Sequence, residues 1–287
     1  MRRTEIPDFF VYGEPARPLD VGFVHVETVL ARQPVHWGKV AAHKHSRLAQ
    51  ITLWTSGSGT YRIEDRSWSF SIPTVSFVPS NVVHGFTIEP GSDAIVVSIA
   101  DVALAALADH SLLSLETPVL VTATEETLPW RKLRATIEAI QSEYADALPG
   151  SDKILPPLIA VALSGIARLT VGMTRLALPA GTALAGRLRG QIDRHFRDDW
   201  PVDRYVAELG TTRHLLDKAA RDVFGMGVRQ AVNERRLVEA KRLLLFTIRT
   251  VEDIAYETGF NDPAYFSRFF SHVVGMPPSD WRQQRSA

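Results

Sequence analysis

Residues 254–282 read IAYETGFNDPAYFSRFFSHVVGMPPSDWR, and this stretch decides how the C-terminal part of the chain folds. It predicts a short helix that ends at Gly259 and a second helix that begins at Asp262. Glycine permits a left-handed turn, and an Asp-Pro pair favours a helix start. The second helix has an apolar face formed by Phe266, Phe269 and Phe270. Its other side chains are therefore expected to point away from the core.

The same plan occurs earlier in the chain, with a short helix over 202–209, a turn at Gly210 and a second helix over 212–224. A long helix over 228–246 joins the two, and about 19 residues at 1.5 Å each span nearly 30 Å, close to the ~34 Å of one DNA turn. One such pair is explained by an ordinary helical hairpin with a charged surface. Two in tandem favour helix-turn-helix units whose second helices enter successive major grooves.

The side chains expected to contact double-stranded DNA are the outward-facing ones on the two second helices. In the first unit they are Arg213, His214, Asp217, Lys218 and Arg221. In the second unit they are Asn261, Asp262, Ala264, Tyr265, Ser267 and Arg268.

The stretch RRLVEAKRLLLFTIRTVEDIAYETGFNDPAYFSRFFSHVVGMPPSDWR, residues 235–282, resembles the signature of AraC/XylS-family transcription regulators. The resemblance covers roughly the last hundred residues. It implies a monomeric DNA-binding module of two helix-turn-helix units, of which the first reads bases more stringently. This chain departs from the pattern in the first unit, where Lys218 replaces the usual arginine and Ala220 the usual phenylalanine, so the first recognition helix is expected to pack less firmly.

Residues 20–100 contain short β-branched or aromatic runs separated by turn clusters, which predicts an antiparallel sandwich or barrel. The expected strands are 25–31, 49–56, 59–65, 68–72, 74–79, 85–90 and 94–99. The pattern then becomes helical over 101–109, 128–148 and 156–176, and LALPAGTALAG, residues 176–186, is typical of a linker. The expected fold class is α+β, with an N-terminal antiparallel barrel plus helices and an all-α C-terminal domain.

The stretch GKVAAHKHSRLAQITLWTSG, residues 38–57, is followed by PSNVVH, residues 79–84, and together they resemble the two cupin motifs. Gln50 stands where a metal-binding cupin has glutamate. We therefore expect a cupin-like effector-sensing domain over 1–100, a helical dimerisation and connecting region over 101–178, and an AraC-type DNA-binding domain over 179–287.

Three interpretations of these histidines remain open. A divalent metal, Zn, Ni or Fe, would be bound by His43, His45, Gln50 and His84. Alternatively the imidazoles bind the carboxylate of an organic effector, or they are ordinary core histidines. Metal and effector are compatible, because an acid can coordinate a bound ion.

The opening IPDFFVYGEP, residues 6–15, together with the cupin motifs resembles the AraC-type activators that respond to 4-hydroxybenzoate and related aromatic acids. This resemblance implies a small aromatic carboxylic acid as effector. The residues expected to bind it are His43, His45, Gln50, Trp54, Arg62 and His84. Trp54 would stack on the ring, and Arg62 or a histidine would bind the carboxylate.

The composition narrows the class of protein. With no cysteine among 287 residues, thiol chemistry and iron–sulfur clusters are excluded, and a cytoplasmic location is expected. The longest apolar stretch, 154–178, is broken by prolines and arginines, so no membrane partner is expected. From Leu184 onward there are 17 basic and 14 acidic residues, which leaves 15 and 18 in the remainder and makes the C-terminal part mildly basic.

These patterns favour a ligand-responsive activator of an aromatic-acid catabolic operon, not an enzyme, acting as a homodimer with RNA polymerase as a further partner. Two alternatives remain: a metal-dependent cupin enzyme acting on aromatic acids, and a regulator whose cupin is only a ligand-free dimerisation scaffold.

Overall fold

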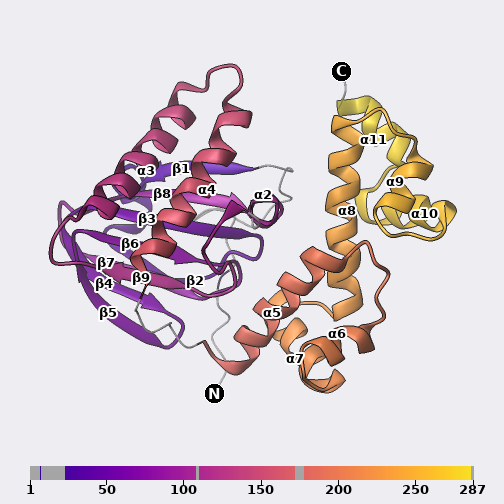
Figure 1. Ribbon diagram of the computed structural model, residues 1–287, viewed down its shortest axis with the longest axis horizontal. Coiled ribbons are helices and arrows are strands. Elements are labelled where there is room, and N and C mark those ends of the chain that lie inside the picture. The colour runs from indigo at the N-terminus through magenta and orange to yellow at the C-terminus, as the bar shows by residue number, and fades with distance from the viewer. Residues whose placement is uncertain (1–6, 8–22, 108–109, 172–177, 286–287) are drawn as a thin grey trace. The chain divides into compact units, whose positions relative to one another are not determined.

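The structure is a computed structural model that describes residue 7 and residues 23–107, 110–171 and 178–285. The chain divides into two units, residues 1–179 and 180–287 (Figure 1). The stretch IPDFFVYGEP lies, apart from Pro7, outside the described residues. Among the helices that are described, none is long and apolar enough to cross a membrane.

The N-terminal unit contains two antiparallel sheets. The five-stranded sheet has the order β1-β8-β3-β6-β9, with β1 Val24–Thr28, β8 Asp93–Ala100, β3 Leu48–Ser56, β6 Thr74–Val78 and β9 Val119–Thr122. The four-stranded sheet has the order β2-β7-β4-β5, with β2 Lys39–His43, β7 His84–Ile88, β4 Ser58–Ile63 and β5 Arg66–Ser71. The antiparallel architecture predicted from the sequence is confirmed.

Alternation along the strands divides the side chains of the five-stranded sheet between two layers. On β3, Ile51 and Leu53 belong to a core shared with the helices, whereas Trp54 packs with Tyr61 and Phe70 of the other sheet. A polar row crosses the inner face, because His25 is paired with Ser98 and Ser98 is paired with Gln50. The space between the sheets therefore has a polar wall beside an aromatic one.

Helices cover the outer face of the five-stranded sheet. The long helices are α3 Leu128–Asp146 and α4 Ser151–Leu169, which lie across this face in Figure 1. Their buried side chains, among them Trp130, Leu133, Ile159 and Leu163, share one core with the sheet. Shorter elements are η1 Leu30–Arg32, α1 Gln33–His36 and α2 Asp101–Ala106.

The C-terminal unit is entirely helical among its described residues. Its helices are α5 Ala180–His195, α6 Val202–Glu208, α7 Arg213–Phe224, α8 Val228–Phe246, α9 Val251–Glu257, α10 Pro263–Val274 and α11 Pro278–Arg285. One core lies beneath α5, α6 and α7, and a second lies beneath α9, α10 and α11, with α8 contributing to both. The expected helices and their order are confirmed.

Three local predictions were wrong. Residues 25–31 do not form one strand, because β1 ends at Thr28 and η1 follows. Strands β2 and β9 were not predicted, and β9 lies between the expected helices 101–109 and 128–148. The proposed linker 176–186 is helical from Ala180, where α5 begins and buries Leu184 and Ala185.

Candidate functional site

The second helix-turn-helix unit is built from local signals at each helix end. Thr250 caps α9: its hydroxyl accepts from the N–H of Asp253, and the Asp253 carboxylate accepts from the N–H of Thr250 in return. Asp262 caps α10 by accepting from the N–H of Ala264 at 2.8 Å. These caps fix where the recognition helix α10 begins, as predicted.

The buried face of α10 consists of aromatic side chains. Phe266 and Phe270 are fully buried, Phe269 is partly buried, and all three lie in one cluster with Phe260. The predicted core face is confirmed. Its packing orients the opposite face of α10 toward solvent.

The outward side chains of this unit lie at the start of α10. Ala264, Tyr265 and Arg268 are exposed, and the Arg268 guanidinium lies 3.8 Å from Asp262. Ser267 is half-buried, whereas the exposed Asn261 donates its amide to Asp199 at 2.8 Å. The structure therefore brings Ala264, Tyr265 and Arg268 together on one surface.

The first unit presents α7 in the same way. Thr212 caps the helix, and the exposed side chains of Arg213, Lys218 and Arg221 form ion pairs with Asp203, Asp222 and Asp217 respectively. Asp217 is also the acceptor for the N–H of Val228 at 3.5 Å, so it ties α7 to the start of α8. His214 is exposed.

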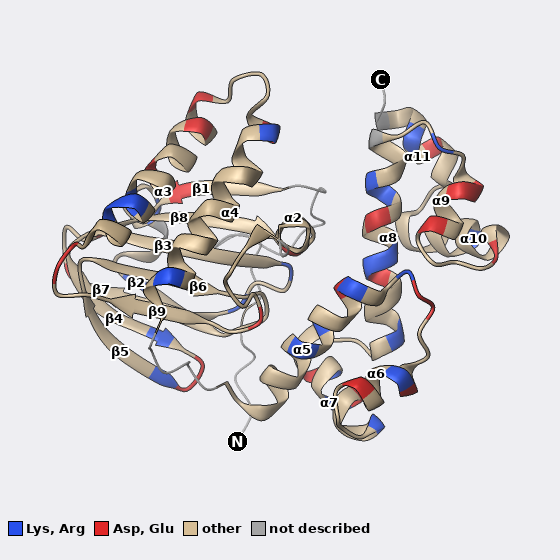
Figure 2. Ribbon diagram, viewed as in Figure 1, with Lys and Arg blue, Asp and Glu red and all other residues tan. Residues whose placement is uncertain are grey.

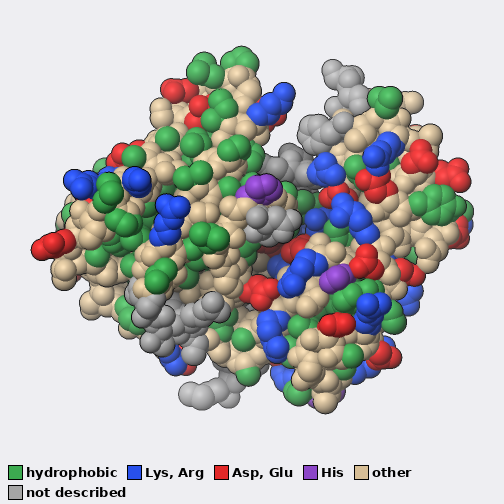
Figure 3. Space-filling view, viewed as in Figure 1, with side chains coloured by type: hydrophobic (Ala, Val, Ile, Leu, Met, Phe, Trp, Pro, Cys, Tyr) green, Lys and Arg blue, Asp and Glu red, His purple; other side chains and the backbone are tan. Residues whose placement is uncertain are grey.

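Basic and acidic side chains alternate over this unit. They are interleaved on the surface in Figure 3 and along α8 in Figure 2. The cations of α7 are thus held by neighbouring carboxylates rather than forming one uniform basic patch.

Sequence reasoning missed Leu215, whose side chain is 51% exposed on α7. An exposed leucine beside His214 offers an apolar contact that suits a thymine methyl group. The helical period that placed His214 and Lys218 outward also places Leu215 there, so the signal was present.

Ala220 lies in the buried core of the first helix-turn-helix unit. It is fully buried, and the cluster around it is completed by Leu188 and Ile192 of α5. Helix α5 thus supplies apolar side chains near Ala220, and looser packing of the first recognition helix stays a prediction.

A buried arginine joins the second unit to the rest of the domain. The Arg236 side chain donates from Nε to the carbonyl of Phe196 at 2.7 Å and pairs with Asp199 at 3.1 Å. Asp199 in turn accepts from Asn261. This network holds the turn of the second unit against α8, which separates the two recognition helices by its 19 residues.

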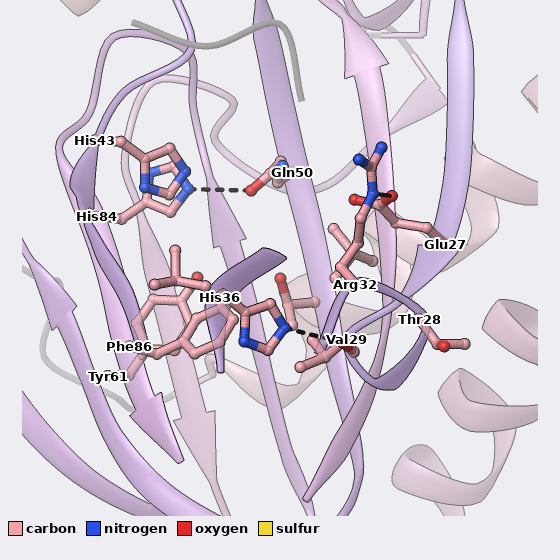
Figure 4. A pocket seen from close by; sticks show the side chains of 13 residues that line it. Glu27, Thr28, Val29, Arg32, His36, His43, Gln50, Tyr61, His84 and Phe86 are labelled. Atoms are coloured by element: carbon pink, nitrogen blue, oxygen red, sulfur yellow. Dashed lines mark hydrogen bonds and ion pairs between the residues drawn. The ribbon is translucent and has the colours of Figure 1, made fainter. Parts of the chain in front are cut away.

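The N-terminal unit holds a cavity of about 40 Å³ between the two sheets (Figure 4). That volume is room for about three water molecules. The lining residues are Glu27, Thr28, Val29, Arg32, His36, Val40, His43, Gln50, Thr52, Tyr61, His84, Phe86 and Val96. In Figure 4 the imidazoles of His43 and His84 face the Glu27–Arg32 pair, with Gln50 between them.

Three buried imidazoles converge at one end of this cavity. His43, His45 and His84 each offer a ring nitrogen, and these nitrogens all lie within 4.8 Å of one another. The Nδ1 atoms of His43 and His84 donate to the carbonyls of Ala41 and Val82, at 2.9 and 3.0 Å. Their Nε2 atoms are therefore the unprotonated ones, as in metal-ligating histidines, and His43 Nε2 lies 3.2 Å from His45 Nε2.

The side chains of Gln50 and His84 place two hydrogen-bond acceptors opposite each other. Gln50 donates from Nε2 to the Ser98 hydroxyl at 3.1 Å, which leaves its Oε1 facing His84 Nε2 at 3.0 Å. Both of these atoms are acceptors when His84 donates from Nδ1. Either rotation of the amide or a cation between the two atoms relieves this repulsion.

Burial sets the charge of the imidazoles. Burial and, to a smaller extent, the neighbouring His45 together lower the pKa of His43 to about 3, although backbone hydrogen bonds oppose the shift. The pKa of His84 is lowered well below its ordinary value, again mainly by burial. Both rings are therefore neutral at pH 7, which is the form that binds metals.

Three predicted effector residues, His45, Trp54 and Arg62, are not among the residues that line the cavity. Arg62 is exposed on β4, where Tyr61 and Ile63 point inward, and its Nε donates to the Glu64 carbonyl. Trp54 is fully buried in the aromatic core beside Phe70, away from the lining. The prediction for Arg62 is wrong because alternate residues of a strand face opposite sides.

The charged groups that do reach the cavity are Glu27 and Arg32, which sequence reasoning missed. Glu27 extends from β1, and Arg32 reaches it from η1, with Arg32 Nε 2.5 Å from Glu27 Oε2. Nothing in the local pattern of the sequence indicated that the chain turns back at this point.

Comparison with known proteins identifies the C-terminal unit. Residues 205–284 match the family model described as a helix-turn-helix domain. The chain is 32% identical over 112 residues to the HTH-type transcriptional activator RhaR of Klebsiella pneumoniae, an alignment that covers 38% of this chain and 40% of that protein. RhaR of Shigella flexneri serotype 5b is 21% identical over 259 residues, covering 86% and 88%. The structure of ToxT from Vibrio cholerae O395 covers 92% of this chain and 98% of its own, at 15% identity and a TM-score of 0.36.

The family match covers the two helix-turn-helix units within the C-terminal part of the chain. The two named relatives are transcriptional activators rather than enzymes. The C-terminal unit therefore contains a helix-turn-helix domain, and the chain is similar to HTH-type transcriptional activators.

Proposed function

We propose that this protein is a ligand-responsive transcription activator that binds double-stranded DNA with α7 and α10. The observation that carries the proposal is the pair of helix-turn-helix units on one long helix, each with an exposed recognition face. Its relatives named as activators support the same function. A regulator of this kind works in the cytoplasm and activates by contact with RNA polymerase.

Arg268→Ala is expected to weaken binding to the DNA upstream of the controlled gene by roughly tenfold. A single arginine contact to a base or phosphate contributes ~1–3 kcal/mol, and losing a phosphate contact lowers the salt slope by about one. Fluorescence anisotropy with a labelled fragment, repeated at several salt concentrations, measures both. Arg66→Ala, an exposed arginine on β5 of the other unit, is the matched control. Equal affinities for wild type and Arg268→Ala contradict the placement of α10 on DNA.

We propose that the effector is a small aromatic carboxylic acid of the hydroxybenzoate class, bound in the cavity between the sheets. The rings of His36, Tyr61 and Phe86 line the cavity and suit an aromatic ring, and Arg32 suits a carboxylate. A ring with a carboxylate exceeds the enclosed volume, so binding requires side chains of the wall to move. Calorimetry with 4-hydroxybenzoate tests the proposal, and absence of heat at millimolar acid contradicts it.

We also propose that His43, His45 and His84 bind a divalent metal, Zn, Ni or Fe, with Gln50 Oε1 as a further ligand. The neutral rings, their backbone-fixed tautomers and the facing acceptors of Gln50 and His84 support this. Such an ion would supply a Lewis-acid centre to which a carboxylate can coordinate. The chain's own residues hold the three rings in place.

His43→Ala is expected to reduce zinc binding from about one ion per chain to near zero and to impair the effector response while DNA binding survives, because three imidazoles are the minimum for a tight site. Elemental analysis after zinc loading and dialysis, together with anisotropy on DNA, measures these effects. The exposed His110→Ala variant is the control. Undiminished zinc in His43→Ala rules out the site.

We further propose a homodimer formed through the α3–α4 hairpin. On α4, Ile154 and Val161 are 46% and 56% exposed, two apolar side chains on the solvent side of the helix. Two linked DNA-binding domains gain affinity through effective concentration. Val161→Glu is therefore expected to shift the chain to monomer in sedimentation velocity; an unchanged profile places the dimer contact elsewhere.

A further inference from the structure

A chain of hydrogen bonds leads from the cavity to helix α3. Arg32 Nε donates to Glu27 Oε2 at 2.5 Å, and His25 Nε2 lies 3.1 Å from the same oxygen. His25 Nδ1 lies 3.0 Å from the hydroxyl of Tyr144 on α3. Four side chains thus connect the ligand cavity to the helical layer.

The direction of each hydrogen bond follows from the chemistry of Glu27. An ionised carboxylate only accepts, so His25 Nε2 carries the proton and donates to it. When the ring carries only this proton, its Nδ1 accepts from the Tyr144 hydroxyl. Burial opposes ionisation of Glu27, but the hydrogen bonds from His25 and Arg32 prevail and hold its pKa below the ordinary value. Glu27 is therefore the charged centre on which both arms of the chain depend.

The position of β1 makes this route physically reasonable. It is an edge strand of its sheet, and its side chains at 25 and 27 share one face, so Glu27, which lines the cavity, lies beside His25. Tyr144 lies near the C-terminal end of α3, which packs against β1, and its ring contacts His25 edge to face at 5.8 Å. A change at His25 therefore acts on the end of a helix that shares its core with α4.

The Arg32–Glu27 pair is well suited to exchange of partners. The side chains of Arg32 and Glu27 are 25% and 15% exposed, and both line the cavity. A ligand carboxylate presents the same two oxygens to the guanidinium as Glu27 does. Arg32 can therefore exchange one carboxylate for another without an unpaired charge being left on the arginine.

We propose that a carboxylate ligand in the cavity takes Arg32 from Glu27, and that the Glu27–His25–Tyr144 chain passes this change to α3. The inference rests on the proposed effector class. When the ligand binds, Glu27 loses its hydrogen bond from Arg32, and this changes the hydrogen bond between Glu27 and His25. The hydrogen bond between His25 and Tyr144 changes in turn, and the C-terminal end of α3 becomes less stable. Because a ligand shifts an equilibrium only through differential contacts, this exchange supplies the contact that differs between the two states.

The test uses the full chain with 4-hydroxybenzoate as probe and 4-hydroxybenzamide as its uncharged counterpart. Arg32→Gln is expected to weaken acid binding by about tenfold, as removal of a charge-assisted hydrogen bond does. Arg62→Gln, an arginine of the same unit that faces solvent, is the matched control. The benzamide is expected to produce no change in α3.

Tyr144→Phe keeps the ring and removes the hydroxyl that contacts His25. It is expected to bind the acid within about twofold of wild type, because Tyr144 does not line the cavity. In wild type, hydrogen exchange over residues 140–146 should rise about threefold when the acid binds, and this rise should be lost in Tyr144→Phe. If hydrogen exchange over residues 140–146 still rises about threefold in Tyr144→Phe, the Glu27–His25–Tyr144 chain does not pass the change to α3.

The remaining outcomes separate this inference from the function. Acid binding that is equal in wild type and Arg32→Gln overturns the exchange at Arg32. If wild type binds DNA but no acid, the exchange is wrong and the DNA-binding function stands. If the acid binds and α3 responds but no upstream DNA is bound, the Glu27–His25–Tyr144 chain stands and the proposed function fails.

Discussion

Gly259→Ala is expected to lower the free energy of unfolding of the C-terminal unit by about 3 kcal/mol. The residue has φ +83°, and a side chain in that conformation costs ~1–2 kcal/mol. The new Cβ would also lie 2.8 Å from the carbonyl oxygen of Arg197 and 2.9 Å from that of Phe196. The Phe196 carbonyl is held by Arg236, so relieving the overlap adds ~1–3 kcal/mol.

Gly210→Ala is the matched control, because Gly210 occupies the same turn of the first unit. It has φ +60°, and no atom lies within 4 Å of the added Cβ, so only the conformational cost of ~1 kcal/mol applies. Urea denaturation followed by hydrogen exchange over 251–282 compares the two. If Gly259→Ala and Gly210→Ala lower the free energy of unfolding equally, residues 196 and 197 do not lie close to the turn at Gly259.

Glu239→Gln is expected to destabilise the same unit by about 2–3 kcal/mol. The Glu239 side chain is 4% exposed and lies 2.7 Å from Arg197, 2.6 Å from Arg242 and 3.5 Å from Arg235. Removing one member of a buried ion pair costs ~3–5 kcal/mol. The expected loss is smaller because Arg197 and Arg242 are 46% and 41% exposed and regain water, whereas Arg235 is 14% exposed.

The same carboxylate makes stability depend on pH. Burial raises its pKa, but hydrogen bonding and charge from Arg242, with Arg235 and Arg197, prevail and lower the pKa below 4.5. The pKa of Glu239 is lower in the folded state than in the unfolded state. Ionised Glu239 therefore stabilises the fold above about pH 4.5, and this stabilisation is lost as the pH falls through the pKa of the folded state. Urea midpoints between pH 7 and pH 3 should therefore fall less steeply in Glu239→Gln. The exposed Glu208→Gln variant should keep the wild-type slope, and identical slopes for all three proteins contradict the assignment.

Much of the fold could be predicted from short stretches of sequence. Asp262 followed by Pro263 marks the start of α10, and the spacing of Phe266 and Phe270 marks its buried face. The histidine cluster was also predicted, since His43 and His84 stand in recognisable motifs and the strands bring them to one place. Strand β2 escaped prediction because Ala41 and Ala42 carry little strand signal.

Other features depend on residues that are far apart in the chain. Arg32 enters the cavity only because the chain turns at η1, and the arginine expected there, Arg62, faces solvent by the alternation of its strand. Asn261 reads as a DNA-contacting residue in sequence, whereas in the fold its amide binds Asp199.

The sequence by itself determined where the helices of the two helix-turn-helix units begin and end, and which histidines meet. These depend on caps and periodicity within a few residues. Only the tertiary structure decided that Gly259 meets the backbone at 196–197 and that Glu27 links Arg32 to Tyr144. Such contacts depend on how separate elements pack against one another, and local sequence carries no record of that packing.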